Sequence, residues 1–221
     1  MSTHAFSALA AVAYCPRKCY YALREGDLEG LPEEVRAIRE LAFRYGELAD
    51  ADDAALSEVP LSVSPLQFRR NLGCARAGLD RFDELAAPPA RDVLLEGKDC
   101  RGIAHKVLED PPEPSLVSAG APPEQGVWEP QTVRAVAAAK ALAYEREQPV
   151  ERAYYEYPAY GIIRTIPLTT RRKATYRRTV RTLEAIDGPP PRLDDNAKCN
   201  PCEYREECGV RTRSLRSLLG L

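Results

Sequence analysis

The sequence predicts an α/β protein in which helices flank a mixed β-sheet. Stretches with helical spacing of apolar residues open the chain and recur near residues 129 and 171. Short runs rich in β-branched and aromatic residues lie between these stretches. Helices that alternate with strands favour a mixed sheet over a helix bundle or a β-sandwich. A chain of 221 residues with 44% hydrophobic residues can bury such a core without disulfides.

The first part of the chain, residues 1–56, is predicted to be helical. Ser7 is a suitable N-cap for the small apolar stretch that follows it. Pro16 interrupts that helix and starts a second one, which is predicted to end near Gly26. A further helical stretch covers residues 32–56 and places five apolar residues at helical spacing: Val35, Ile38, Leu41, Ala42 and Tyr45.

Residues 57–190 are predicted to form the core. From residue 57 to 120, short runs separated by Pro and Gly predict a sheet with turns. The Ala-rich stretch 129–147 predicts a helix. Two strands, broken at Pro158 and Gly161, are predicted next, and a basic helix follows. A Pro-rich linker then leads to a cysteine loop, so residues 191–221 are taken as a separate C-terminal part.

Bulk properties indicate a cytoplasmic protein that does not enter membranes. No segment approaches the roughly 20 apolar residues of a membrane span, and the N-terminus lacks the basic and apolar regions of a signal peptide. An odd count of seven cysteines in a reducing compartment favours metal or redox chemistry over a disulfide framework. The net charge is only -2, so any attraction to nucleic acid must be local.

Three cysteines near the end of the chain point to a metal site. Cys199, Cys202 and Cys208 have the spacing Cys-x2-Cys-x5-Cys in a polar loop, which can offer three thiolates to one face. The fourth ligand must come from elsewhere, with Cys15 and Cys19 beside Pro16 as candidates and with Cys74 and Cys100 as the remaining cysteines. One remote cysteine joined to an asymmetric triplet favours an iron–sulfur centre over a zinc ribbon, although zinc and an unmetallated loop stay open.

The two cysteine motifs carry a resemblance to a known family. "AVAYCPRKCYY" and "CNPCEYREEC", bracketing a sheet-and-helix core, resemble the CRISPR-associated iron–sulfur exonucleases of the RecB nuclease type, often called the Cas-four family. The resemblance implies a RecB/restriction-endonuclease-like sheet with an iron–sulfur domain formed from the N-terminal helices and the cysteine loop. It also implies one 4Fe-4S cluster on four ligands: Cys15, Cys199, Cys202 and Cys208. Cys19 would then be a reserve ligand or a small core residue.

The resemblance also implies a Mg- or Mn-dependent nuclease centre, but the expected residues are absent from this sequence. His105 occupies the place of an Asp on one strand, and Leu116 and Ser118 occupy the Glu and Lys places on the next. Other family positions are also changed: Arg134 stands for Gln, Ala138 for Tyr, and Asp50 for an early His. Carboxylates are needed to hold a hard divalent cation. The sequence therefore predicts a degenerate centre without catalytic residues.

Acidic residues elsewhere could in principle rebuild such a centre. The candidates lie in two short stretches: Asp80, Asp83, Glu84, Glu96 and Asp99. A solvated acidic face is the simpler interpretation of both stretches.

A basic stretch precedes the cysteine loop and is a candidate for DNA contact. Its cations are Arg171, Arg172, Lys173, Arg177, Arg178 and Arg181. Lys173, Arg177 and Arg181 recur every four residues on one helical face, while Tyr176, Val180 and Leu183 are expected on the buried side. Such a face would attract phosphates without base specificity, and a merely solvated basic face is the alternative.

Three functions remain open from the sequence. The first is a DNA-binding or adaptation-complex scaffold that has lost nuclease activity, with DNA and the CRISPR adaptation integrase as partners implied by the resemblance. The second is a metal-dependent single-stranded DNA exonuclease acting in spacer acquisition. The third is a metal-stapled protein-interaction domain with no role on DNA.

Overall fold

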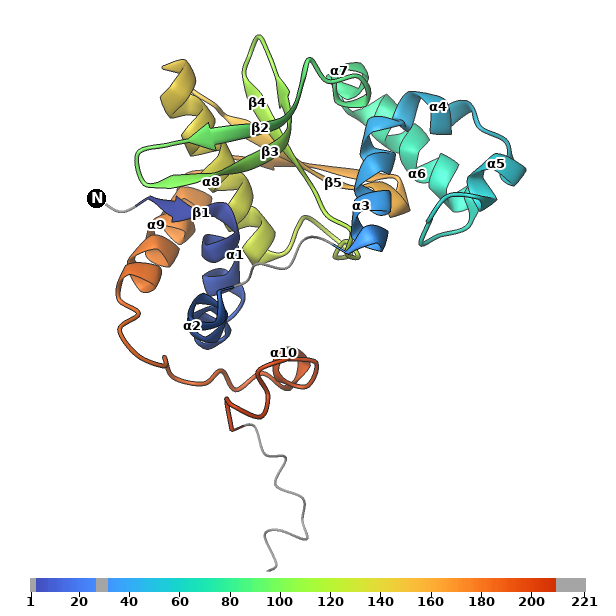
Figure 1. The fold of residues 1–221 in the computed structure, drawn as a ribbon. Coiled ribbons are helices and arrows are strands. Elements are labelled where there is room, and N and C mark those ends of the chain that lie inside the picture. The colour runs from blue at the N-terminus through green and yellow to red at the C-terminus, as the bar shows by residue number, and fades with distance from the viewer. Residues whose placement is uncertain (1–2, 27–31, 210–221) are drawn as a thin grey trace, which may run out of the picture.

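The computed structural model describes residues 3–26 and 32–209, and within them six strands form one mixed sheet flanked by helices (Figure 1). The strands are β1 His4–Ala5, β2 Ala90–Glu96, β3 Cys100–Leu108, β4 Glu113–Val117, β5 Arg152–Tyr157 and β6 Ile162–Pro167. Their order is β1-β3-β4-β5-β6, with β2 also paired to β3. The β1/β3 and β4/β5 pairs are parallel and the others antiparallel. The predicted α/β class is thus confirmed.

The described helices fall into two groups. On one side of the sheet lie α1 Phe6–Tyr14, α2 Pro16–Glu25, α8 Glu129–Arg146 and α9 Thr170–Glu184. At the other end lie α3 Glu33–Glu40, η1 Leu41–Phe43, α4 Tyr45–Asp50, α5 Asp53–Ser57, α6 Pro65–Gly78 and α7 Phe82–Ala86 (Figure 1). The short η2 Pro158–Tyr160 separates β5 from β6, and α10 Asn196–Cys199 lies in the C-terminal loop.

The sheet separates two apolar clusters. Helix α8 packs on β2, β3, β4 and β5 and is itself covered by α1 and α9, so that its many alanines are buried. The second cluster joins the other face of the sheet to η1 and α4–α7 around Tyr45, Phe68 and Leu72. Strands β4 and β5 are parallel, so the chain has to return from the end of β4 to the start of β5. Helix α8 makes this crossover on one face of the sheet. The ends of β3, β4 and β5 therefore lie under one helix.

Several predicted elements are confirmed and others are wrong. The two N-terminal helices, the strands at 90–96 and 100–108, the helix at 129–146, the break at Pro158–Gly161 and the basic helix all form. Ser7 lies inside α1 rather than at its cap, because the pairing of β1 with β3 starts the helix at Phe6. The predicted single helical stretch 32–56 is three α-helices and a 3-10 turn, since the chain leaves helical geometry at Arg44 and Ala51.

The prediction of sheet over residues 57–120 is also wrong for its first half, because the first strand in this region begins at Ala90. Helix α6 begins at Pro65, where Ser64 accepts a hydrogen bond from the Gln67 backbone N–H at 3.3 Å. Phe68 and Leu72, four residues apart, bury the inner side of this helix. Ser followed by Pro at the first helical position is a start signal for a helix. The frequent Pro and Gly nearby separate short helices here, not strands.

The boundaries proposed at residues 56 and 190 stay predictions. Residues 1–2 and 27–31 of the predicted N-terminal part, and residues 210–221 of the predicted C-terminal part, lie outside the described residues. Within the described ranges no helix is both long and apolar enough to cross a membrane.

Candidate functional site

Four cysteines from the two ends of the chain line one pocket, which we call the cysteine pocket. They are Cys15, Cys199, Cys202 and Cys208. The remaining walls are tyrosines, cations and one leucine: Tyr14, Tyr21, Tyr204, Arg17, Lys18, Lys198, Arg205 and Leu193. The structure thus brings together the four predicted ligands across almost the whole length of the chain.

Cys15 owes its position to the break between α1 and α2. Its backbone is extended, with φ −160° and ψ 112°, and Pro16 starts the next helix. The Cys15 Sγ accepts a hydrogen bond from the Lys18 backbone N–H at 3.4 Å, so this side chain caps α2. The positive end of a helix dipole favours a negative group. The Cys15 sulfur is therefore fixed at the N-terminal end of α2, beside the cysteine pocket.

The three late cysteines are held in the C-terminal loop, residues 191–209, by successive tight turns. Asp195 caps the short α10 by accepting from the Ala197 N–H at 3.1 Å. The Cys202 N–H donates to the Cys199 carbonyl at 3.3 Å, and the Cys208 N–H donates to the Tyr204 carbonyl at 2.8 Å. This coiled backbone directs three thiols from ten consecutive residues towards one pocket.

The loop and the linker before it run below α2 in Figure 1. Polar and aromatic contacts attach both to this helix. Arg17 donates to the Pro190 carbonyl at 2.8 Å, and the Tyr21 hydroxyl donates to the Glu207 carbonyl at 3.2 Å. The Tyr204 hydroxyl donates to the Glu25 carboxylate at 2.8 Å, and its ring stacks on Tyr21 with centroids 5.5 Å apart. These contacts hold the ends of the chain together around the sulfurs.

The other cysteines lie outside this pocket. Cys19 is 1% exposed, and burial, together with the nearby Cys15, raises the pKa of its thiol to about 11. Cys100 is also buried, in β3, and burial raises its pKa to about 11. Cys74 is exposed on α6. Cys19 is thus a core residue in this structure, one of the two roles expected for it.

The donor set of the cysteine pocket fits an iron–sulfur group. Four sulfurs are the usual ligands of a 4Fe-4S cluster, and each binds a different iron, so the sulfurs surround a volume rather than a point. Among the described residues, no three Cys, His, Asp or Glu side chains are arranged to hold a single metal ion. Lys18 and Lys198 lie over the Tyr14 ring, 5.9 Å and 5.4 Å from its centroid, and place positive charge beside the thiols.

The positions that the resemblance assigns to a nuclease centre, His105, Leu116 and Ser118, lie under the first half of α8. His105 is buried on β3, and its Nδ1 accepts a hydrogen bond from the Val117 N–H at 2.9 Å. The proton of the neutral ring is therefore on Nε2. Leu116 is fully buried in the apolar cluster beneath α8. The Ser118 hydroxyl accepts from the Gln131 amide at 3.4 Å, and Gln131 in turn accepts from the Tyr157 hydroxyl at 2.5 Å.

The three remaining family positions do not add a ligand there. Arg134 is half-buried on α8, near His105, and Ala138 is fully buried on the same helix. Asp50 is exposed at the end of α4, in the other group of helices (Figure 1). Gln131, which the sequence analysis did not single out, is the residue of α8 that contacts Ser118.

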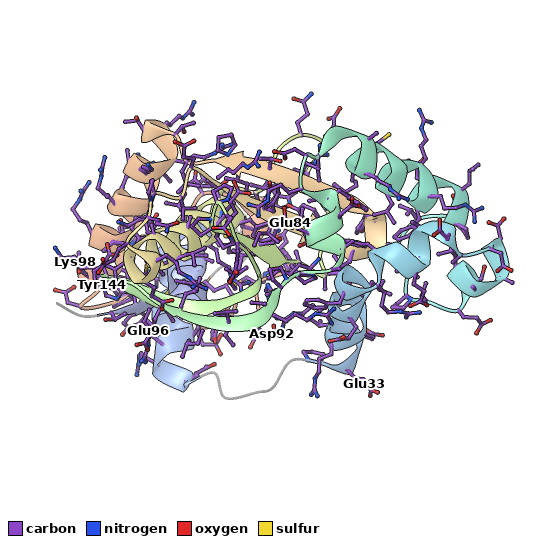
Figure 2. All side chains as sticks on the ribbon, turned by 90° about the horizontal axis from the view of Figure 1, so that it is seen from above. Glu33, Glu84, Asp92, Glu96, Lys98 and Tyr144 are labelled. Carbon is purple, nitrogen blue, oxygen red and sulfur yellow. The ribbon has the colours of Figure 1, made fainter. Side chains whose placement is uncertain are left out.

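The acidic residues considered as substitutes are engaged elsewhere. Asp80 accepts from Arg152 at 2.8 Å, Glu84 accepts from Arg81 at 2.5 Å, and Asp99 accepts from the Tyr176 hydroxyl at 2.9 Å. Asp83 lies in the first turn of α7. Figure 2 shows Glu84 and Glu96 on well-separated parts of the molecule. These side chains therefore do not form a group around His105.

His105 is expected to make stability depend on pH. Burial lowers its pKa from 6.5 to about 2, with further lowering by Arg39, Arg134 and Lys106. The folded state thus keeps a neutral ring, whereas the unfolded chain takes up a proton below about pH 6.5. The free energy of unfolding should fall by about 1.4 kcal/mol per pH unit from about pH 6 to about pH 4 on this account, and the penalty is absent above that range.

Urea unfolding of wild type and His105→Asn at several pH values measures this effect. The asparagine oxygen can replace Nδ1 as acceptor but does not titrate. The free energy of unfolding of wild type should therefore fall more steeply with decreasing pH than that of His105→Asn, by the slope that one proton gives. Parallel pH profiles would show that His105 is accessible to protons in the folded protein.

The basic helix presents its charges to solvent as predicted. Arg171, Lys173, Arg177, Arg178 and Arg181 are exposed. Arg172 is half-buried and donates to the Pro167 carbonyl at 2.8 Å. On the inner side Tyr176 and Val180 are buried, and Leu183 packs against the main core. The end of α9 and residues 185–191 line an open cleft with Arg178 and Arg181 on its wall.

One buried ionic group was not predicted. Lys106 and Glu156 are both 0% exposed, and the Lys106 Nζ lies 2.7 Å from the Glu156 carboxylate. The Lys106 Nζ also donates to the carbonyls of Ala42 and Leu85, each at 2.6 Å. The Ser115 hydroxyl donates to Glu156 at 2.5 Å. The signal in the sequence was a single charge inside each of two otherwise apolar strands, "GIAHKVL" and "AYYEY".

Comparison with known proteins adds one distant relative. The chain is 25% identical over 230 residues to an uncharacterized protein of Archaeoglobus fulgidus, and the alignment covers 96% of this chain and 97% of that one. No protein-family model matches the chain.

Proposed function

We propose that this protein is a CRISPR-associated, RecB-like iron–sulfur protein that binds DNA as a scaffold and does not cut it. The observation that carries the proposal is the meeting of Cys15 with Cys199, Cys202 and Cys208 at one pocket. A motif at each end of the chain suggested this arrangement, and the fold supplies a geometry in which both motifs serve the same site. A 4Fe-4S cluster would supply a covalent link between the two ends.

The surroundings of the cysteine pocket support a negatively charged group. Four thiolates carry more negative charge than the iron and sulfide of a cluster neutralise. Arg17, Lys18, Lys198 and Arg205 line the same pocket and offset that charge. Such a link would close a loop of nearly the whole chain. By the chain-entropy estimate used for crosslinks, it would stabilise the folded state by about 5 kcal/mol.

The absence of cleavage follows from the side chains at the nuclease positions. Leu116 cannot bind a cation, Ser118 is hydrogen-bonded to Gln131, and His105 has its Nδ1 occupied by a backbone N–H. A divalent ion needs several oxygen ligands, which carboxylates normally supply. Strands β3 and β4 and helix α8 would then be the scaffold of a lost nuclease centre, and the residues that would bind its metal are absent from these positions.

Anaerobic purification tests the cluster. We expect about four iron and four sulfide per chain and the broad visible absorption of a 4Fe-4S cluster. One zinc per chain without sulfide would overturn the iron–sulfur assignment. The same preparation, incubated with end-labelled single-stranded DNA and Mn²⁺, should leave the DNA intact. Cleavage that disappears in His105→Ala would replace the scaffold by the exonuclease alternative.

DNA binding is expected to depend on α9. Exchanging Arg177 and Arg181 for glutamine removes two exposed cations, so the slope of log affinity against log salt should decrease by about 1.4 on single-stranded DNA. The matched control is R70Q/R76Q, which removes two exposed arginines from α6 and should leave the slope unchanged. Fluorescence anisotropy with labelled DNA over a series of salt concentrations measures both. Equal slopes in all three proteins would favour the interaction-domain alternative.

Partner binding is part of the same proposal. The CRISPR adaptation integrase is the partner that the resemblance suggests, and co-purification of the cluster-loaded protein with that integrase is the direct test. Binding that persists after Arg177 and Arg181 are exchanged would show that DNA is not the bridge.

A further inference from the structure

Three arginines from three separate elements lie near His105, Tyr155 and Tyr157. Arg39 belongs to α3, Arg134 to α8 and Arg164 to β6. Leu116, Tyr155 and Arg164 are register partners across β4, β5 and β6. Direct partners project from the same face of a sheet, so Arg164 lies on the face covered by α8.

Tyr155 connects the three arginines. Its side chain is 3% exposed and lies close to Arg134, and Arg39 lies within electrostatic range of both. Arg164 is near the next tyrosine of the strand, Tyr157. The group therefore occupies the region of His105 and Ser118, on the opposite face of the sheet from Lys106 and Glu156.

These arginines lack carboxylate partners. In the described residues none of the three forms an ion pair, whereas Arg81 and Arg152 each pair with two carboxylates. The Nε atoms of Arg134 and Arg164 are buried without any hydrogen-bond partner in that same part of the chain. Buried charged donors left unpaired are costly. The unpaired atoms thus mark a place where an acceptor would stabilise the protein.

One acidic residue is near this group. Asp92 on β2 attracts Arg39, and the β2/β3 register places it across from His105. Its side chain is exposed, and Figure 2 shows it on the strand that faces helix α3. A single exposed carboxylate opposes three guanidinium groups, so the site keeps a net positive charge.

We propose that Arg39, Arg134 and Arg164 form a binding site for a phosphoryl group, in the region where a nuclease would hold its divalent cations. Guanidinium groups present paired N–H donors that match phosphate oxygens, and the tyrosine hydroxyl adds a further donor. All three arginines are partly exposed, so a ligand can reach them from solvent. The sign of the site is thereby reversed: it takes the anion directly and needs no metal to bridge to it.

This site is independent of the cluster and of α9. The phosphoryl group could belong to the end of a nucleic acid or to a free phosphate compound, since the same donors recognise both. Titration calorimetry with the purified full chain in phosphate-free buffer distinguishes them. The probes are inorganic pyrophosphate, a trinucleotide with a 5′-phosphate and the same trinucleotide without it.

Wild type is expected to bind at least one of the two phosphorylated probes saturably. Arg39→Gln and Arg134→Gln should each weaken that binding by about tenfold or more, as expected for loss of a charge-assisted hydrogen bond. Arg70→Gln on α6, which removes an exposed arginine outside this group, should bind as wild type does. Preference for the phosphorylated trinucleotide over the unphosphorylated one assigns a nucleic-acid end, and binding of pyrophosphate alone assigns a free phosphate compound.

Two results would overturn the proposal. One is the absence of saturable binding of either phosphorylated probe by wild type. The other is unchanged affinity in Arg39→Gln. That variant keeps the test decisive if Arg134→Gln fails to fold, because Arg39 lies on the short helix α3 and outside both apolar clusters. A negative result for the phosphoryl site would not contradict the proposed cluster or the proposed DNA contact by α9. Those two proposals are tested separately, by iron content and by the salt dependence of DNA binding.

Discussion

Replacing Cys15 by alanine is expected to remove most of the iron and to lower the free energy of unfolding by about 5 kcal/mol. This residue is the only proposed ligand from the first part of the chain, so its loss opens the link between the two ends. Cys199→Ala should also lower the iron content but should cost less stability, because Cys202 and Cys208 would still tie the C-terminal loop to the cluster. Iron analysis and urea unfolding under anaerobic conditions measure both changes.

The matched control is Cys74→Ala, which removes an exposed thiol from α6 and should leave iron content and stability unchanged. Limited proteolysis gives a second readout, since the linker at residues 188–192 should become easier to cleave once the C-terminal loop is released. Full iron content in Cys15→Ala would rule out Cys15 as the sole possible ligand from the first part of the chain. Loss of iron when Cys19→Ala is added would then identify Cys19 as the ligand that takes its place.

Exchanging Lys106 for methionine is expected to cost about 3–5 kcal/mol of folding stability. Both charges of the pair are completely buried, and Glu156 would lose its cationic partner and keep the Ser115 hydroxyl as a hydrogen-bond donor. The carbonyls of Ala42 and Leu85 would lose their donor as well. Urea unfolding at neutral pH measures the difference.

A double variant separates the pair from simple packing. In K106M/E156Q neither charge of the pair remains, and the side-chain amide at position 156 can still accept a hydrogen bond from Ser115. This protein should therefore be more stable than Lys106→Met alone. Lys98→Met is the surface control, because Lys98 is exposed after β2, and it should change stability by less than about 0.5 kcal/mol. Equal effects of Lys106→Met and Lys98→Met would contradict the buried pairing.

Local signals in the sequence were sufficient where one element is specified by its own residues. Pro16 starts α2, the alanines of 129–146 form a buried helix, and the Tyr- and Ile-rich run breaks at Pro158. These predictions succeeded because helix propensity, proline geometry and apolar periodicity act over a few residues. The same rules were misapplied at residues 65–86, where frequent Pro and Gly suggested turns between strands although the buried residues, Phe68 with Leu72 and Phe82 with Leu85, have helical spacing.

The sequence by itself determined the chemistry of the candidate sites. It supplied the cysteines, showed that Leu116 cannot hold a cation, and placed a row of cations on one side of α9. Which residues meet was decided by the tertiary structure. Cys15 lies beside Cys199, Lys106 beside Glu156, and Arg39 near Arg134 only because the sheet order brings distant strands and helices together. Such contacts depend on the packing of the whole chain around α8, which no short stretch of residues encodes.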